Sequence, residues 1–291
     1  MPSKQINNNS FLKRILKFKQ FQIIFKLIFI ILSPILYLLK NMGEYFIFLS
    51  RAFRINKSKI SYKSYIVNQM YFIGINSLPI IIVTSFFSGM VAAANAGHQM
   101  TGPLSDFLNS SSLIGGIVGQ SVLMELAPVI SGLVLAGKVG ATISSEIGAM
   151  VVTEQINALE SISIDSVSFL TFPRIIAGTI MFPILIVVAD FCGIFGGFVS
   201  FTTTLNMDGL LYWEGLKSWK IPAYDAILGF VKAFVFGITI TSIACYYGFK
   251  TKGGAYGVGR STALTVVTSC VSLIILNYLL TIILNQIKNL L

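Results

Sequence analysis

The chain has 291 residues, of which 55% are hydrophobic and only 11% are charged, and its mean hydropathy is +0.81. A soluble domain of this length cannot bury so much apolar surface, so the composition predicts an integral membrane protein without a separate catalytic domain. One histidine and three cysteines, with no C-x-x-C pair, argue against haem, copper and zinc sites and against a disulfide framework. We therefore expect no catalytic residue, no metal and no cofactor.

The net charge of +10 is concentrated in the N-terminal region. Residues 1–78 hold twelve Lys and Arg residues against one acid, Glu44. These basic residues alternate with Phe, Ile and Leu, a pattern that favours binding to anionic lipid headgroups over binding to nucleic acid. We therefore expect a membrane-surface role and no nucleic-acid partner.

Residues 1–77 are predicted to form a basic amphipathic region that lies at the membrane interface. Residues 11–19 place apolar and basic side chains on opposite helical faces. The apolar run of residues 21–39 is long enough to span the membrane, but basic residues flank both of its ends. Because such flanks keep both ends on one side, an interfacial or re-entrant helix is favoured over a span.

Residues 78–291 are predicted to form the membrane domain, an all-α bundle with five spans. If the basic region is cytoplasmic or stromal, the odd number of spans places the C-terminus on the opposite side. The outer loop 204–224 carries Tyr212, Trp213 and Trp219, which suit either anchors in the interface or a docking surface for an outer partner. The expected spans are Leu78 to Ala96, Leu113 to Val139, Ile175 to Phe201, Tyr224 to Tyr247 and Ala263 to Leu284.

Small residues recur four apart within the spans, as at Gly115 and Gly119 or Gly193 and Gly197. They allow close helix contacts either within one chain or between two copies, and spacing alone does not choose.

Two glycine-rich stretches resemble phosphate-binding loops but lack their context. Residues 132–139 read GLVLAGKV, where Val139 stands in place of the Ser or Thr that holds Mg²⁺ in a P-loop. Residues 253–260 read GGAYGVGR without a preceding strand, which favours a mobile inner loop. We expect no nucleotide site in this chain.

Three charged residues fall inside the predicted spans: Glu125, Asp190 and Lys232. A lone charge in the bilayer centre costs about 2.5 to 3.5 kcal/mol or more, so each is expected to face a partner or a wet cavity. Glu125 and Lys232 have opposite signs and suit either a structural ion pair or a polar spot in a substrate path. Asp190 suits a helix-packing hydrogen bond or a functional role.

The segment between the second and third spans is acidic and amphipathic. Residues 144–165 read SSEIGAMVVTEQINALESISID and contain four acids and no base. A short acidic helix that projects from a membrane subunit is suited to docking into a groove on a soluble partner.

Four short motifs follow in order from Glu125: ELAP, AGKVG, EIGAM and TEQINAL, with PRIIAG at residues 173–178. In this order and spacing they closely resemble the MlaE permease family, the membrane subunits of MCE-associated ABC lipid transporters. The resemblance extends from about residue 65 to the C-terminus.

The resemblance implies a permease subunit that moves phospholipid or a related lipid between membranes, with ATP hydrolysis in a separate chain. It implies a homodimer of permeases, ABC ATPase subunits on the cytoplasmic or stromal side and an MCE-domain lipid-binding protein on the opposite side. Glu125 and Lys232 would lie beside the lipid path. The ATPase-coupling helix would contain Glu146, Glu154, Gln155, Asn157, Leu159 and Glu160.

The chain departs from the bacterial pattern at two positions. Met124 stands where bacterial members often have Arg, and Asn277 stands where they have an acid, so a charge network there is thinner in this chain. Lys outnumbers Arg sixteen to five, as in AT-rich genomes. This composition suggests a plastid-encoded algal member in the chloroplast envelope, or an AT-rich bacterium with the protein in its inner membrane.

Two other functions fit parts of the sequence. A self-sufficient ion-coupled carrier would use the intramembrane charges but would not need the acidic docking segment. A structural membrane anchor would not need the intramembrane charges.

Overall fold

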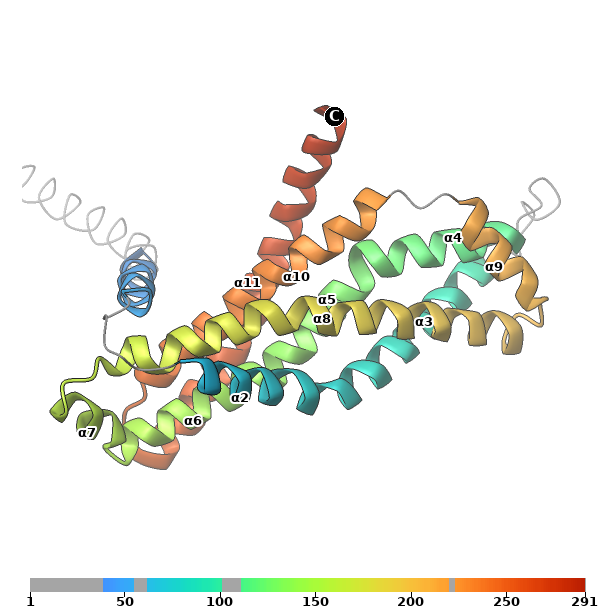
Figure 1. Ribbon diagram of the computed structural model, residues 1–291. Helices are drawn as coiled ribbons and strands as arrows, with labels where there is room; N and C mark the ends of the chain where they lie inside the picture. The colour runs from blue at the N-terminus through green and yellow to red at the C-terminus, as the bar shows by residue number, and fades with distance from the viewer. Residues whose placement is uncertain (1–38, 55–61, 101–110, 220–222, 291) are drawn as a thin grey trace, which may run out of the picture. The chain divides into compact units, whose positions relative to one another are not determined.

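The computed structural model describes residues 39–54, 62–100, 111–219 and 223–290, and Figure 1 shows their helices. The chain divides into two compact units, Met1–Arg51 and Ala52–Leu291, which are treated separately. In the first unit the described residues, 39–51, all lie in one helix. The predicted interfacial segments 11–19 and 21–39 lie outside the described residues apart from Leu39, so their membrane placement stays a prediction.

The described part of the second unit consists of helices and their connections, which confirms the all-α prediction. Two of the elements, η2 and η3, are single π-helical turns inside a longer helix. The elements in chain order are α2 (Lys63–Gly74), η1 (Ile75–Ser77), α3 (Leu78–Met100), α4 (Ser111–Ser121), η2 (Val122–Leu126), α5 (Ala127–Leu135), η3 (Ala136–Gly140), α6 (Ala141–Val152), α7 (Gln155–Ser161), α8 (Ser166–Thr203), α9 (Gly209–Ser218), α10 (Ala223–Phe249) and α11 (Gly254–Leu290).

Five helices in the described residues are long and apolar enough to cross a membrane, as predicted, and each contains one of the predicted spans. The first begins at Lys63 and runs through residue 77, so α2 and η1 continue directly into α3. The proposed division of the chain at residue 77 stays a prediction. The five helices are Lys63–Gln99, Leu113–Val152, Ser166–Thr203, Tyr224–Phe249 and Gly254–Gln286.

Two segments that were expected to be loops are helical. The outer segment contains α9, which starts where the Asp208 carboxylate accepts a 3.0 Å hydrogen bond from the Leu210 amide. The glycine-rich inner stretch is a short turn followed by the first turns of α11. Gly253 and Gly254 have φ values of 91° and 67°, which only glycine adopts at little cost, and they reverse the chain within two residues.

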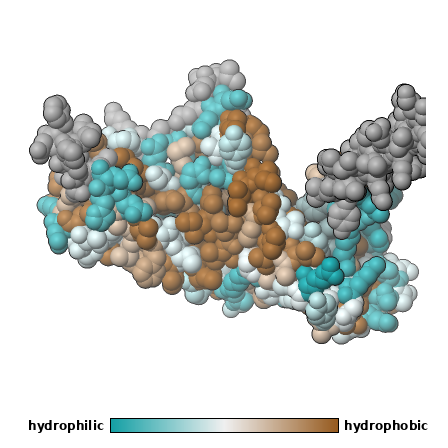
Figure 2. Space-filling view, turned by 180° about the vertical axis from the view of Figure 1, so that it is seen from behind, coloured by the Kyte–Doolittle hydropathy of each residue, from teal (hydrophilic) through white to brown (hydrophobic). Residues whose placement is uncertain are grey.

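Helix α8 lies at the centre of the bundle, packed against α3 on one side and α10 on another. A Cβ on Gly89 would collide with the Gly193 backbone, so small residues allow α3 and α8 to touch. Gly193 and Gly197 therefore serve packing within one chain. Figure 2 shows apolar surface over the middle of this unit and hydrophilic residues towards two of its ends, as a membrane-spanning bundle requires.

Candidate functional site

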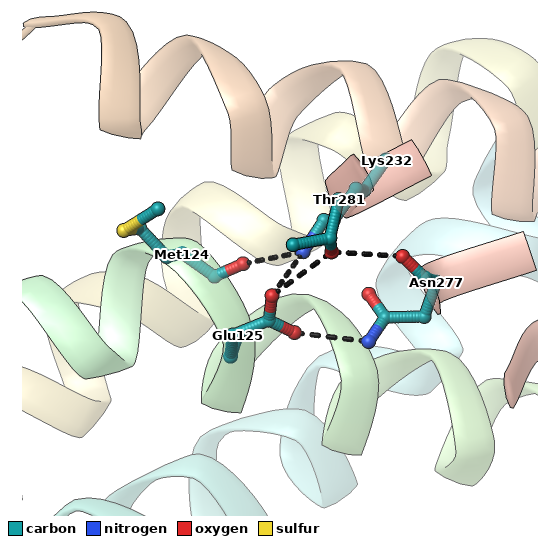
Figure 3. Close-up of polar contacts among 5 residues, drawn as sticks. All are labelled: Met124, Glu125, Lys232, Asn277 and Thr281. Atoms are coloured by element: carbon teal, nitrogen blue, oxygen red, sulfur yellow. Dashed lines mark hydrogen bonds and ion pairs between the residues drawn. The ribbon is translucent and has the colours of Figure 1, made fainter. Parts of the chain in front are cut away.

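Four polar side chains from three spanning segments meet at Glu125 (Figure 3). Lys232 on α10 places Nζ 2.6 Å from Glu125 Oε1. The Thr281 hydroxyl on α11 is 3.1 Å from the same oxygen and shares its proton with the Asn277 carbonyl of its own helix, 2.8 Å away. Asn277, one turn before Thr281, donates to Glu125 Oε2 through Nδ2 at 2.9 Å. The two opposite charges thus form an ion pair, one of the two arrangements considered for them, and the cluster ties η2 to α10 and α11.

The local backbone at Glu125 provides a further acceptor for the lysine. Glu125 lies in the π-helical turn η2, and Pro128 follows in the first turn of α5. Because proline has no N–H, it cannot donate to the Met124 carbonyl four residues earlier. That carbonyl instead accepts a 3.0 Å hydrogen bond from Lys232 Nζ. Helical π-turns occur frequently at functional sites, since they redirect side chains.

The two charges of the cluster differ in exposure. The Lys232 side chain is 2% exposed, whereas the Glu125 side chain is 40% exposed. A buried ammonium needs a partner because its desolvation costs several kcal/mol, on the order of the gain from a well-formed ion pair. The Glu125 carboxylate therefore stabilises the buried Lys232, while the rest of the Glu125 side chain remains exposed.

The exposed side of Glu125 forms part of a cavity of about 1000 Å³ between α3 and the segment from α4 to α5. This volume lies at the upper end of the range for small-molecule sites. One wall is a stripe on α3 from Thr84 to Gln99, which at about 1.5 Å per residue is roughly 22 Å long. Most of the lining is apolar. The cavity is thus long and amphipathic, as an acyl chain with a polar end would require.

A second polar cluster lies at the α9 end of the cavity. Gln120 on α4 donates through Nε2 to Asp225 Oδ2 at 2.7 Å and accepts a 2.7 Å bond from the Trp219 indole at Oε1. Asp225 is fully buried, and both Gln120 and Trp219 line the cavity. A Cβ on Gly116 would collide with the Trp219 side chain, so this glycine makes room for the ring.

Helix α9 itself is held by a tyrosine that was expected to anchor in the interface. Tyr212 is fully buried, and its hydroxyl donates to the Ile194 carbonyl on α8 at 3.1 Å. Burial raises the pKa of Tyr212, so the phenol stays protonated and remains a donor. Trp213 and Trp219 are 38% and 37% exposed, which leaves both the anchor and the docking interpretation open for them.

The acidic segment predicted for docking divides into two parts. Glu146 belongs to α6, where it forms a 3.2 Å ion pair with Arg174 of α8. Arg174 is 1% exposed, donates to the Leu170 carbonyl and lies 5.8 Å from the Tyr65 ring centroid. Glu146 therefore has a partner within its own chain and joins α6 to α8 beside the docking segment.

The second part is the short helix α7, which has no buried residue. Glu154 and Ser163 flank it with φ values of 57° and 64°, a conformation that non-glycine residues seldom adopt. Glu154, Gln155, Asn157 and Glu160 are exposed, and Leu159 is half-buried. Glu160 also accepts a 2.8 Å hydrogen bond from Ser166, the first residue of α8.

Asp190 is half-buried on α8, and its Oδ1 has no hydrogen-bond partner in the described part of the chain. This oxygen thus makes no packing hydrogen bond among the described residues, and the role of Asp190 stays a prediction. The P-loop lookalike at residues 132–139 is helical, and Lys138 donates to the Asn76 carbonyl. Among the described residues, no group of three His, Cys, Asp or Glu side chains could hold a metal ion.

The sequence did not point to Gln120, Asp225 or Thr281 as members of polar clusters. Gln120 and Thr281 are neutral residues inside apolar runs and carry no charge that demands a partner. Asp225 stands at the start of a predicted span, where an acid is ordinary. In the sequence, Arg174 stands out only as part of the PRIIAG motif, yet it is among the most deeply buried side chains of the described chain.

Comparison with known proteins identifies relatives across most of the chain. The family described as Permease MlaE matches residues 66–283. A probable ABC transporter permease protein of Rickettsia bellii is 43% identical over 220 residues, which cover 76% of this chain and 83% of the relative. The intermembrane phospholipid transport system permease protein MlaE of Haemophilus influenzae is 34% identical over 216 residues, covering 74% and 81%. The probable ABC transporter permease protein ycf63 of Pyropia yezoensis is 30% identical over 216 residues, covering 74% and 80%.

Proposed function

This chain belongs to the MlaE permease family, and on that premise we propose that it moves phospholipid or a related lipid between membranes. It is an ABC transporter permease, an integral membrane protein rather than the subunit that hydrolyses ATP. ATP hydrolysis by a separate ATPase subunit would supply the energy.

The observation that carries the lipid assignment is the cavity beside Glu125. Its volume of about 1000 Å³ and its long, mainly apolar walls suit an acyl chain better than a polar solute. We assign Glu125 and Lys232 to the lipid path. In this role the Glu125 carboxylate is a fixed polar group in the cavity wall, because the buried Lys232 ammonium holds it in place.

The coupling to the ATPase is assigned to α7. Its exposed polar residues and its half-buried Leu159 suit insertion into a groove on a soluble partner. Glu154, Gln155, Asn157, Leu159 and Glu160 would contact the ATPase. Glu146 would act indirectly, because its ion pair with Arg174 joins α6 to α8, the two helices that α7 connects.

The other proposed partners follow from the family and from the exposed apolar surface. Much of α11 carries exposed large hydrophobic residues such as Val271 and Ile274, which suit contact with lipid or with a second permease in a homodimer. An MCE-domain lipid-binding protein is proposed on the face opposite the ATPase. The ycf63 relative supports a plastid envelope location, and the Rickettsia relatives support a bacterial inner membrane as the alternative.

Two alternatives fit the site less well. An ion-coupled carrier needs a titratable group that can exchange its ion, but Glu125 is held by Lys232, Asn277 and Thr281 together. A structural anchor has no use for a cavity of this size. Neither alternative explains the exposed helix α7, which is flanked by two residues in the left-handed backbone conformation, Glu154 and Ser163.

The coupling proposal is tested by changing the charge of α7. Glu154→Lys combined with Glu160→Gln removes both acids and keeps an acceptor for Ser166 at residue 160. Exposed charges contribute about 0 to 1 kcal/mol to stability, whereas mismatched charges at an interface can cost several kcal/mol of association. We expect a membrane-inserted protein of near-normal thermal stability that loses its ATPase and its lipid transfer together.

The measurements are co-purification of the ATPase and lipid transfer in reconstituted vesicles. Glu214→Lys, an equivalent reversal on the exposed surface of α9, is the control and should retain both. Lipid transfer that continues after the ATPase is lost would contradict the proposal and favour a carrier.

A further inference from the structure

The cavity wall carries hydrogen-bonding groups without charge towards its α9 end. Asn95 and Gln99 lie one turn apart on α3, and both line the cavity with exposed side chains. Neither side chain bonds to another residue in the described part of the chain. Two amides that can each donate and accept therefore face the same space.

The opposite wall is neutral as well and is held in a fixed arrangement. Buried Asp225 accepts from one end of the Gln120 amide, and the Trp219 indole donates to the other end at 2.7 Å. Gln120 still has one N–H and one lone pair to offer, and exposed Ser121 lies beside it in the lining. Asp225 is thus a positioning residue that presets Gln120 and Trp219.

Among the described residues, one charged residue lines the cavity, and it is an acid. Glu125 already receives Lys232, Asn277 and Thr281, and its neighbour in the wall is the apolar Met124. The nearby basic residues His98 and Lys217 are exposed and do not line the cavity. A phosphate is usually bound by Arg or Lys, and here it would meet a carboxylate and, among the described residues, no cation in the lining.

We propose that this cavity selects a lipid with an uncharged, hydroxyl-rich headgroup, of the glycosyl diacylglycerol type, over a lipid with an anionic phosphate headgroup. Sugar hydroxyls donate and accept, so they match Asn95, Gln99 and Gln120 without requiring a counter-ion. This inference rests on the proposed lipid function and specifies the headgroup that the same cavity accepts.

The test is native mass spectrometry of the full chain in detergent. The protein is offered an equimolar mixture of monogalactosyl diacylglycerol and phosphatidylglycerol with identical acyl chains. Binding is counted in excess of an Ala92→Trp variant, which fills the cavity from α3. Since a few added hydrogen bonds change affinity by a small factor each, we expect the galactolipid to be retained about fivefold over phosphatidylglycerol.

The three outcomes have different meanings. Preference for the galactolipid supports the inference. Equal retention, or preference for phosphatidylglycerol, overturns the headgroup inference and leaves the lipid function standing. Retention of neither lipid above the Ala92→Trp baseline overturns the inference and the proposed lipid path together.

Two variants test the same inference by moving the preference. Met124→Arg adds a cation to the wall and should shift the ratio towards phosphatidylglycerol. Asn95→Leu with Gln99→Leu removes two amides and should bring the ratio close to one. Asn76→Leu removes an exposed amide outside the cavity and should leave the ratio unchanged. A ratio that none of these substitutions moves would contradict selection by the wall.

Discussion

Two ion pairs in this chain have similar exposure and different surroundings. Lys232 and Arg174 are 2% and 1% exposed, while their partners Glu125 and Glu146 are 40% and 35% exposed. Glu125 receives further donors from α11 and faces the cavity, whereas Glu146 lies in the middle of α6 and pairs with α8. The same kind of ion pair thus forms part of a cavity wall in one region and joins two helices in the other.

The comparison also shows what determines the surroundings of a buried cation. Lys232 is a point charge with two acceptors, the Glu125 carboxylate and the Met124 carbonyl. Arg174 has a wider group that bonds Glu146 and the Leu170 carbonyl, while its Nε has no partner among the described residues. We therefore expect the Glu125 pair to depend more strongly on its carboxylate.

The largest effect is expected from Glu125→Met. It leaves Lys232 buried with only the Met124 carbonyl, and loss of one member of a buried pair costs about 3 to 5 kcal/mol. The measurement is the midpoint of thermal unfolding of the purified protein in detergent. The double variant Glu125→Met with Lys232→Met should recover most of the loss, and a double variant as unstable as the single one would contradict the pairing account.

A smaller effect is expected from Glu146→Met. Because Arg174 keeps the Leu170 carbonyl and the Tyr65 ring, we expect a loss of about 2 to 3 kcal/mol. Glu146→Gln retains an acceptor and should lose less. Thermal unfolding of both variants beside Glu125→Met gives the order, and equal losses at Glu125 and Glu146 would remove the distinction between the two pairs.

The smallest effect is expected from Thr281→Val, which removes one of the donors to Glu125 and leaves Lys232 and Asn277 in place. A net hydrogen bond contributes about 1 kcal/mol. Thr262→Val on the same helix is the control, because its hydroxyl bonds only the Val258 carbonyl of its own helix. The account requires a measurably larger shift in the unfolding midpoint for Thr281→Val than for this control.

Part of this arrangement could be predicted from the sequence. Apolar runs of sufficient length predicted all five spanning helices, because the bilayer sets the length of each crossing. Opposite charges inside two spans predicted the Glu125–Lys232 contact, since neither can be left alone in lipid. In both cases the membrane imposes a strong constraint, on the length of an apolar run or on a charge within it, and both features can be seen in the sequence.

Other features depend on tertiary contacts that composition does not reveal. The outer segment was expected to be a loop because its hydropathy is low, but Asp208 caps a helix there and Tyr212 is buried against α8. Gln120 and Asp225 are 105 residues apart, and they meet where α10 packs against η2, the turn that directly follows α4. Arg174 lies next to the start of a predicted span, and the sequence does not show that Glu146 of α6 lies beside it.

The central claim is that lipid passes through the cavity beside Glu125. The most direct measurement is lipid transfer by the reconstituted permease and its ATPase, with Ala92→Trp compared with Phe191→Trp. Ala92 lines the cavity, whereas Phe191 is 72% exposed on α8 and does not line it. With ATPase co-purification normal in both, we predict that Ala92→Trp loses most of its transfer and Phe191→Trp retains it. Normal transfer through the filled cavity would contradict the account.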